Sequence, residues 1–263
     1  MTSVVNSILE HADYFILLVF RVGGLVFASP IFGRINVPAI AKIGLTATLG
    51  YLFFTIFPQT TPIEYTTLIG FVLICALELM VGLCLSFVTN IFFALTAYTA
   101  GQLIDMQLGY GIVSVYDAQN STQAPVMGNV LNLILLIVFF AEEGHLKLIE
   151  VLYMTFDRMP VGTLVLSPEI GIVAAELFTK AFLLGVMVAL PVLAAGLTME
   201  FILGMLMRTV PQIHMFVVGV PLKMLVGLLV FIATIPVFVG FSTRIFDELF
   251  SGVGDMFATF VGG

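Results

Sequence analysis

The sequence contains no tryptophan and few charged residues. Charged residues make up 10% of its 263 residues and hydrophobic residues 60%, whereas soluble domains carry roughly 25% charged residues. Such a chain cannot present a surface that water wets. This excludes a soluble domain and predicts an integral membrane protein or a core component of a membrane assembly. Without tryptophan, an aromatic belt at the membrane surface would have to rest on tyrosines such as Tyr14 and Tyr51.

Basic residues and catalytic motifs are also scarce. The chain has 9 lysines and arginines and a net charge of -7, with no basic patch, which excludes nucleic-acid binding. Neither a Gly-x-Ser-x-Gly elbow nor a phosphate-binding P-loop occurs. The histidines are isolated, and with Cys75 and Cys84 they show no metal-ligand spacing. We therefore expect no enzyme activity, no metal and no cofactor.

Long hydrophobic runs are abundant. They are too long and too apolar for soluble strands and predict helices at residues 14–32, 37–57, 65–98, 127–141, 170–207 and 217–241. A spanning helix needs about 20 residues, so the fourth run is short. The third would be roughly 50 Å long as a helix, and the fifth contains Pro191, which should kink or break it. Two interpretations stay open: helical hairpins and broken helices packed on other protein, or roughly six to eight ordinary transmembrane helices.

Several ionisable residues lie inside or at the edges of these apolar runs: Arg21, Lys42, Glu78, Asp105, Lys180, Glu200 and Lys223. Each charge at the bilayer centre costs about 3 kcal/mol on insertion scales, so such residues usually face protein or water and find partners. One interpretation is a proton or ion relay through Glu78, Glu200 and Asp105. The other is a set of buried ion pairs and hydrogen bonds that fix how helices and subunits dock, and the nearly balanced signs favour it.

A polar, glycine-marked segment, residues 101–128, interrupts the hydrophobic chain. Irregular backbone at membrane depth is tolerated only where it is buried in protein or lines a watery cavity. The segment is therefore predicted to be either a long loop outside the membrane or the working part of a pore.

Three motifs carry a family resemblance. Residues 208–223 read Arg-Thr-Val-Pro-Gln-Ile-His-Met-Phe-Val-Val-Gly-Val-Pro-Leu-Lys, 21–24 read Arg-Val-Gly-Gly, and 101–109 read Gly-Gln-Leu-Ile-Asp-Met-Gln-Leu-Gly. These stretches resemble the FliR family of flagellar export-gate proteins and their injectisome counterparts, the T subunits of type III secretion. The chain departs from the family pattern at His214, where asparagine is usual, and at Ala118, where proline is common after Asp117.

The resemblance implies an all-α, membrane-associated fold of helical hairpins and broken helices within a hetero-oligomeric export gate, in place of a simple transmembrane bundle. Residues 1–263 would form one domain, with helical halves at about 1–100 and 129–241, a plug loop at 101–128 and a tail at 242–263. The implied partners are the P and Q subunits, the B (switch) subunit, unfolded export substrates in transit and membrane lipid, with no nucleic acid. The implied location is the bacterial inner membrane, in the flagellar basal body.

The resemblance also implies roles for particular residues. The central loop would plug the export channel, with glycines as hinges and apolar residues as the stopper, through Gly101, Asp105, Met106, Gly109, Tyr110, Gly111, Ile112, Val113 and Asp117. A passive connecting loop is the alternative. Buried charged and polar groups would hold the assembly together: Arg21, Lys42, Glu78, Glu200, Arg208, Gln212 and Lys223.

A different class of function stays open from the residues alone. A secondary transporter for a small solute or ion would use Glu78 and Glu200 as coupling groups and the break at Pro191 as a half-helix binding site. Such a protein would function alone, whereas an export-gate subunit would need its partners.

Overall fold

A computed structural model describes residues 11–57, 65, 67–109, 125–163, 169–209 and 215–261, and every regular element in these ranges is a helix. The α-helices are α2 (Ala12–Ala28), α3 (Ala39–Ile56), α4 (Leu68–Asn90), α5 (Thr96–Leu108), α7 (Val126–Ala141), α8 (Gly144–Arg158), α9 (Ile170–Thr209) and α10 (Val220–Val261). Two π-helical turns, η1 (Ile91–Leu95) and η2 (Met215–Gly219), precede α5 and α10. The expectation of an all-α membrane fold is confirmed.

Several helices are long enough and apolar enough to cross a membrane. Four runs in the described residues qualify by length and hydropathy, and α7 with α8 would add a fifth if they form one broken span. The four are Ala39–Ile56, Leu68–Leu108, Ile170–Thr209 and Val217–Phe260. Three of them hold 40 or more residues, about twice the length that a single crossing needs. The mismatch between helix length and bilayer thickness is therefore a property of the fold.

The chain divides into two compact units. The first comprises Met1–Asn90, Glu142–Leu177 and Leu249–Gly263, and the second comprises Ile91–Ala141 and Phe178–Glu248. Each unit thus gathers segments that lie far apart in the sequence.

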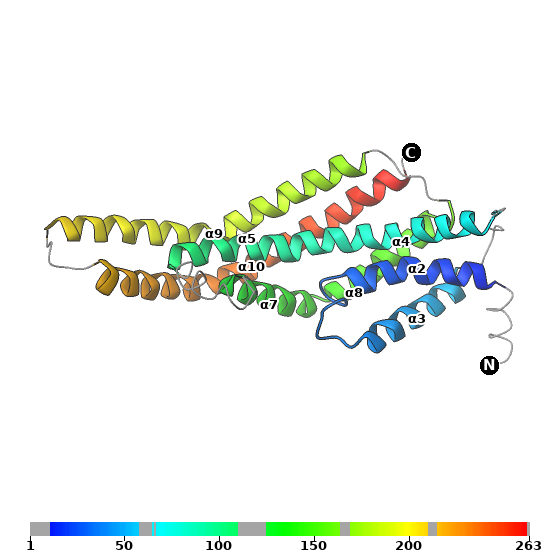
Figure 1. The fold of residues 1–263 in the computed structure, drawn as a ribbon, viewed down its shortest axis with the longest axis horizontal. Coiled ribbons are helices and arrows are strands. Elements are labelled where there is room, and N and C mark those ends of the chain that lie inside the picture. The colour runs from blue at the N-terminus through cyan, green and yellow to red at the C-terminus, as the bar shows by residue number, and fades with distance from the viewer. Residues whose placement is uncertain are drawn as a thin grey trace. The chain divides into compact units, whose positions relative to one another are not determined.

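In the first unit, α2 packs against both α3 and α4. Figure 1 shows α2 and α3 as a hairpin. The Tyr14 hydroxyl near the start of α2 donates to the Phe57 carbonyl at the end of α3 over 2.9 Å. Phe53 and Phe57 then lie against Phe156 of α8, with ring centroids 4.8 and 6.0 Å apart. An aromatic core therefore joins the hairpin to α8.

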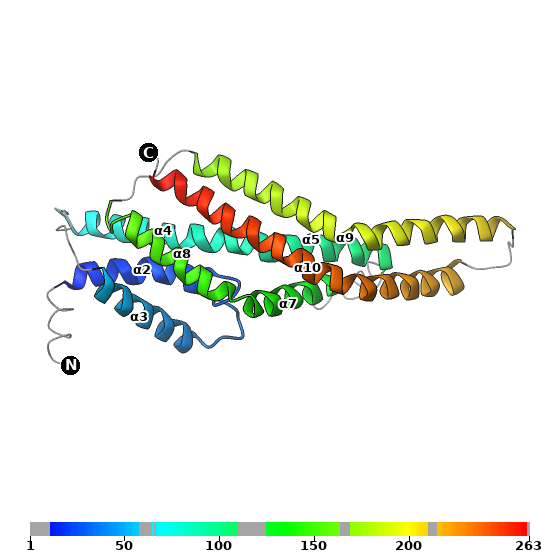
Figure 2. The same cartoon turned by 180° about the vertical axis from the view of Figure 1, so that it is seen from behind.

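In the second unit, α5 packs against α7, and the two helices lie side by side in Figures 1 and 2. Phe93 of η1, Phe139 of α7 and Phe246 of α10 form an aromatic cluster. The ring centroids are 5.1 Å apart for Phe93 and Phe139, 6.0 Å for Phe93 and Phe246, and 5.3 Å for Phe139 and Phe246. This cluster fixes α10 against η1 and α7.

Small residues let the helices of the second unit approach closely. A Cβ added at Gly185 of α9 would lie 2.9 Å from the carbonyl oxygen of Thr96, whose hydroxyl donates to the Ala181 carbonyl over 3.2 Å. At Gly227 of α10, an added Cβ would lie 2.1 Å from Cδ2 of Leu108. Glycine and hydroxyl contacts of this kind are common where helices associate in membranes.

Both long helices of the second unit pass through prolines. α9 continues through Pro191 and α10 through Pro236. Figure 1 shows the axis of α9 changing direction near its middle. The sequence predicts a kink or a break at Pro191, and the helix continues through that residue without ending.

The structure corrects the bounds of the predicted loop at 101–128. α5 continues to Leu108 and α7 begins at Val126, so both described ends of that segment are helical. α5 ends at Gly109, which has a φ of 84° and donates its N–H to the carbonyls of Asp105 and Met106, as in a left-handed helix C-cap. Polar residues within α5 do not stop a helix, whereas this glycine does. Likewise, α10 continues through the predicted tail, residues 242–263, as far as Val261.

Candidate functional site

Arg21 of α2 and Glu78 of α4 form a fully buried ion pair. Nε of Arg21 donates to Oε2 of Glu78 over 2.6 Å, and both side chains are 0% exposed. Two charges withdrawn from solvent in this way are tolerated only when they pair closely and fill their remaining hydrogen-bonding positions.

The Arg21 guanidinium also holds the end of α8. Its Nη1 donates to the carbonyls of Thr155 and Met159, over 3.0 and 3.1 Å. The Thr155 carbonyl also accepts the N–H of Met159, the residue that follows the last turn of α8, so the guanidinium lies at the negative end of the helix dipole. The guanidinium carbon lies 4.6 Å from the centre of the Phe156 ring. Arg21 thus caps α8 with a full positive charge.

Glu78 fixes the turn that follows α8. Its Oε1 accepts the backbone N–H of Gly162 over 2.8 Å. Gly162 has a φ of 86°, a conformation that glycine adopts without steric cost. The single ion pair therefore ties together α2, α4, the end of α8 and the turn after it.

Beyond the ion pair, α4 contacts α2 through one face. The residues of this face are spaced four apart: Glu78, Gly82, Ser86 and Asn90. A Cβ at Gly82 would lie 2.1 Å from the Arg21 carbonyl oxygen. The Ser86 hydroxyl donates to the carbonyls of Gly24 and Leu25, and the Asn90 amide donates to the Ala28 carbonyl over 2.6 Å. Gly82, Ser86 and Asn90 were not predicted from the sequence, although their helical spacing from Glu78 was a usable signal.

The other predicted assembly residues have varied surroundings. Glu200 of α9 and Lys223 of α10 form an ion pair, with the Glu200 side chain 43% exposed. Lys42 donates to the Gly33 carbonyl over 2.9 Å. Arg208 is exposed in the last turn of α9, and Gln212 lies outside the described residues. The structure thus pairs Arg21 with Glu78 and Glu200 with Lys223. It brings Lys42 and Arg208 to no carboxylate among the residues that it describes.

The candidate gating site is the α5–α7 junction, formed by Gly101, Asp105, Met127 and Gly128. A Cβ at Gly101 would lie 2.1 Å from the backbone nitrogen of Gly128, so the two helices touch through their backbones there. Oδ1 of Asp105 accepts the Met127 N–H over 3.3 Å at the start of α7, where backbone donors lack intrahelical partners. The junction therefore holds the last turns of α5 against the start of α7.

The structure describes some of the predicted plug residues and not others. Gly101 and Asp105 are buried residues of α5 that pack against the start of α7. Met106 is 64% exposed, and Gly109 ends the helix. The other predicted plug residues lie outside the described residues: Tyr110, Gly111, Ile112, Val113 and Asp117.

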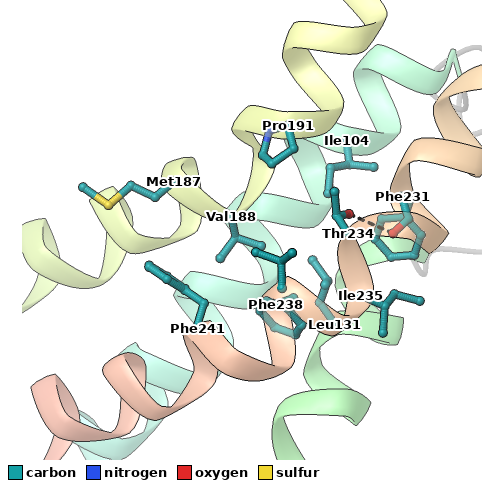
Figure 3. Close-up of a pocket in the computed structure, with 11 residues that line it drawn as sticks. Ile104, Leu131, Met187, Val188, Pro191, Phe231, Thr234, Ile235, Phe238 and Phe241 are labelled. Carbon is teal, nitrogen blue, oxygen red and sulfur yellow. Dashed lines mark hydrogen bonds between the residues drawn. The ribbon is translucent and has the colours of Figure 1, made fainter.

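An apolar cavity of about 90 Å³ lies in the second unit beside Pro191. Figure 3 shows Met187, Val188 and Pro191 of α9 facing Phe238 of α10 across it. Leu131 of α7 and Ile104 of α5 also line it. The hydroxyl of Thr234 donates to its own helix, at the Phe231 carbonyl over 2.8 Å, so it offers no donor to a water. Atoms that line such a void lack part of their packing.

The described residues contain no group of three or more His, Cys, Asp or Glu side chains that could hold a metal ion. Glu78 is engaged by a guanidinium and a backbone N–H, and Glu200 by an ammonium. The charged groups of both units therefore act on neighbouring helices, and the α5–α7 junction adds a close backbone contact.

Comparison with known proteins gives a consistent result. A family described as "Bacterial export proteins, family 1" matches residues 12–249. The chain is similar to "Flagellar biosynthetic protein FliR" of Escherichia coli (strain K12), with 30% identity over 90% of this chain and 89% of that protein. The protein of the same name from Bacillus subtilis (strain 168) is 30% identical over 88% of this chain and 90% of its own length. That of Aquifex aeolicus (strain VF5) is 26% identical over 89% and 90%.

Proposed function

The chain belongs to the family of bacterial export proteins, family 1, and from this premise we propose that it is a structural and gating subunit of the type III protein-export channel of the flagellum. The observation that carries the proposal is the family match over residues 12–249, which spans both compact units. The role is non-enzymatic, and the subunit is needed for flagellum biosynthesis.

Segment 110–124 plugs the pore in this proposal, with Tyr110, Ile112 and Val113 as the stopper. The support comes from its two ends. Gly101 and Gly128 hold α5 and α7 in backbone contact, and Asp105 bonds to the start of α7, so the two helices that flank the segment are fixed to each other. A plug needs such a fixed base, because a closing segment with a moving base would not return to the same position.

The proposed partners are other export-gate subunits, namely P and Q, together with the B (switch) subunit around the entrance. Unfolded export substrates pass in transit, and lipid contacts the outside. The proposed location is the bacterial inner membrane within the flagellar basal body. The domain is residues 1–263, with the plug segment 110–124 between two helical halves, of which the first ends with α5 and the second begins with α7. The length and hydropathy of four helical runs support the membrane location.

Deletion of residues 110–115 tests the plug. We expect cells that carry the deletion to leak small ions or a small dye, while the export gate still assembles, because the deleted residues lie outside the α5–α7 junction. The measurement is dye uptake in growing cells together with co-purification of the gate subunits. A replacement of the same six positions by glycine and serine separates loss of the apolar stopper from loss of length. An unchanged leak in an assembled gate would count against the plug.

A further inference from the structure

A groove of about 410 Å³ lies in the first unit, between α8 and the last turns of α10. One charged residue and seven uncharged ones line it: Arg158, Val151, Met154, Phe250, Val253, Gly254, Phe257 and Ala258. On α8 the lining residues are spaced by three and four positions, so they share one face, and the α10 residues follow the same spacing. Both helices thus present an apolar stripe to the groove.

The cation of this groove has no acidic partner in the described part of the chain. Arg158 is exposed in the last turn of α8, and no carboxylate among the described residues lies within ion-pair distance of it. Its acidic neighbour Asp157 does not line the groove. Lys147, on the same face of α8, has its ammonium 5.5 Å from the centre of the Phe250 ring. The two cations of this face therefore differ, since Lys147 contacts an aromatic ring and Arg158 contacts none among the residues that the structure describes.

We propose that this groove binds one anionic phospholipid of the surrounding membrane. The Arg158 guanidinium holds the phosphate, because its planar fork of donors matches two phosphate oxygens. An acyl chain lies along Met154 and Phe257, where apolar surface would otherwise lack a partner. Charge complementarity selects an anionic lipid over a zwitterionic one, since a net negative headgroup gains from the cation without bringing its own ammonium.

The test uses the full chain within the export-gate complex, released from vesicles of phosphatidylcholine mixed with phosphatidylglycerol, with retained lipids counted by native mass spectrometry. We expect the wild-type protein to keep one phosphatidylglycerol in preference to phosphatidylcholine. Arg158→Gln should lower that preference roughly fivefold, and Met154→Trp, which fills the groove, should lower retention of both lipids. Lys147→Gln is the matched control, because it removes a cation from the same face of α8 and should leave the preference unchanged.

Other outcomes would overturn the proposal. An Arg158→Gln protein of unchanged helix content that keeps the wild-type preference would do so. Displacement of phosphatidylglycerol by inorganic phosphate alone would assign the site to free phosphate. A photoreactive residue at Met154 that cross-links to protein in cells, with no lipid adduct, would assign the groove to an acidic protein partner. Arg158→Lys keeps the charge and should keep more of the preference than Arg158→Gln.

Discussion

Arg21 shows how much of this fold depends on one side chain. Its guanidinium holds Glu78, two carbonyls at the end of α8 and the face of Phe156, all without contact with solvent. Its Nη2 has no hydrogen-bond partner in the described residues. Truncation of either charged residue would leave the other charge buried alone, and this costs about 3–5 kcal/mol. Replacement of both by apolar residues of similar volume would avoid that penalty.

We therefore expect Arg21→Met and Glu78→Met each to abolish accumulation of the assembled gate, and the double variant to recover most of it. The measurement is the amount of gate complex extracted from membranes and its thermal unfolding in detergent. Lys42→Met is the control, because the Lys42 ammonium makes one hydrogen bond to a carbonyl and its loss should cost about 1 kcal/mol. Normal assembly with lost export in the single variants would instead favour a proton or ion relay.

The pairing of these buried charges was predicted in part from the sequence. Balanced charges in apolar runs indicated that the ionisable groups would pair. The sequence did not predict that Arg21 pairs with Glu78. The two residues are 57 positions apart, and the sequence does not show which helices become neighbours. The Gly162 and Thr155 contacts involve backbone atoms, which every residue carries, so no side-chain pattern could indicate them.

At the scale of the helices, glycines mark the places where backbones touch. An added Cβ would lie 2.1 Å from the Arg21 carbonyl at Gly82 and 2.1 Å from the Gly128 nitrogen at Gly101. Both contacts are with backbone, which cannot move aside as the end of a flexible side chain can. Gly44 and Gly204 lie in helices with nothing within 4 Å of an added Cβ. Close helix packing therefore requires glycine at positions 82 and 101, whereas positions 44 and 204 have room for a side chain.

Alanine substitution at these glycines gives a matched comparison. Gly82→Ala and Gly101→Ala should destabilise the protein by about 1–3 kcal/mol, because the helices must separate or strain. Gly44→Ala and Gly204→Ala should be neutral or stabilise it by up to about 1 kcal/mol, since alanine favours a helix. Thermal unfolding of the detergent-purified gate measures the difference. Equal melting temperatures for Gly82→Ala and Gly44→Ala would contradict the close packing of α2 on α4.

Helix bounds could be predicted where apolar runs end sharply, as at the predicted run 37–57 for Ala39–Ile56. They could not where helices are amphipathic. α8 was missed because Lys147, Glu150 and Asp157 interrupt its apolar residues, although its buried face repeats at helical spacing. The polar residues from Gly101 onward indicated a loop, but α5 continues through them, with Asp105 against the start of α7 and Gln107 against Gly196 of α9.

At the scale of the whole molecule, most of the apolar surface of the candidate membrane spans is not buried inside the chain itself. In each of the four candidate spans, between 17% and 28% of the most apolar window is buried inside the chain itself. The rest must be covered by lipid or by other protein, because exposed apolar surface of this extent is not tolerated in water. Helices twice the length of a span favour protein as part of that cover.

Purification in mild detergent tests this. We expect the chain to co-purify with small hydrophobic gate subunits as a defined complex, and to aggregate when it is produced alone, because its apolar faces then lack partners. Size-exclusion chromatography of both preparations is the measurement. A stable monomer or homodimer from the chain alone would favour a secondary transporter with Glu78 and Glu200 as coupling groups.

The α5–α7 junction has one more consequence, which concerns tolerance to insertion. Because Gly101 against Gly128 and Asp105 against Met127 close the chain on itself, residues added between Gly109 and Pro125 need not alter the packing of either helix. Each doubling of the length of such a closed segment costs only about 0.6 kcal/mol of chain entropy. The stretch between these helices is therefore a place where a peptide tag or protease site could be inserted with little effect on the packing of α5 and α7.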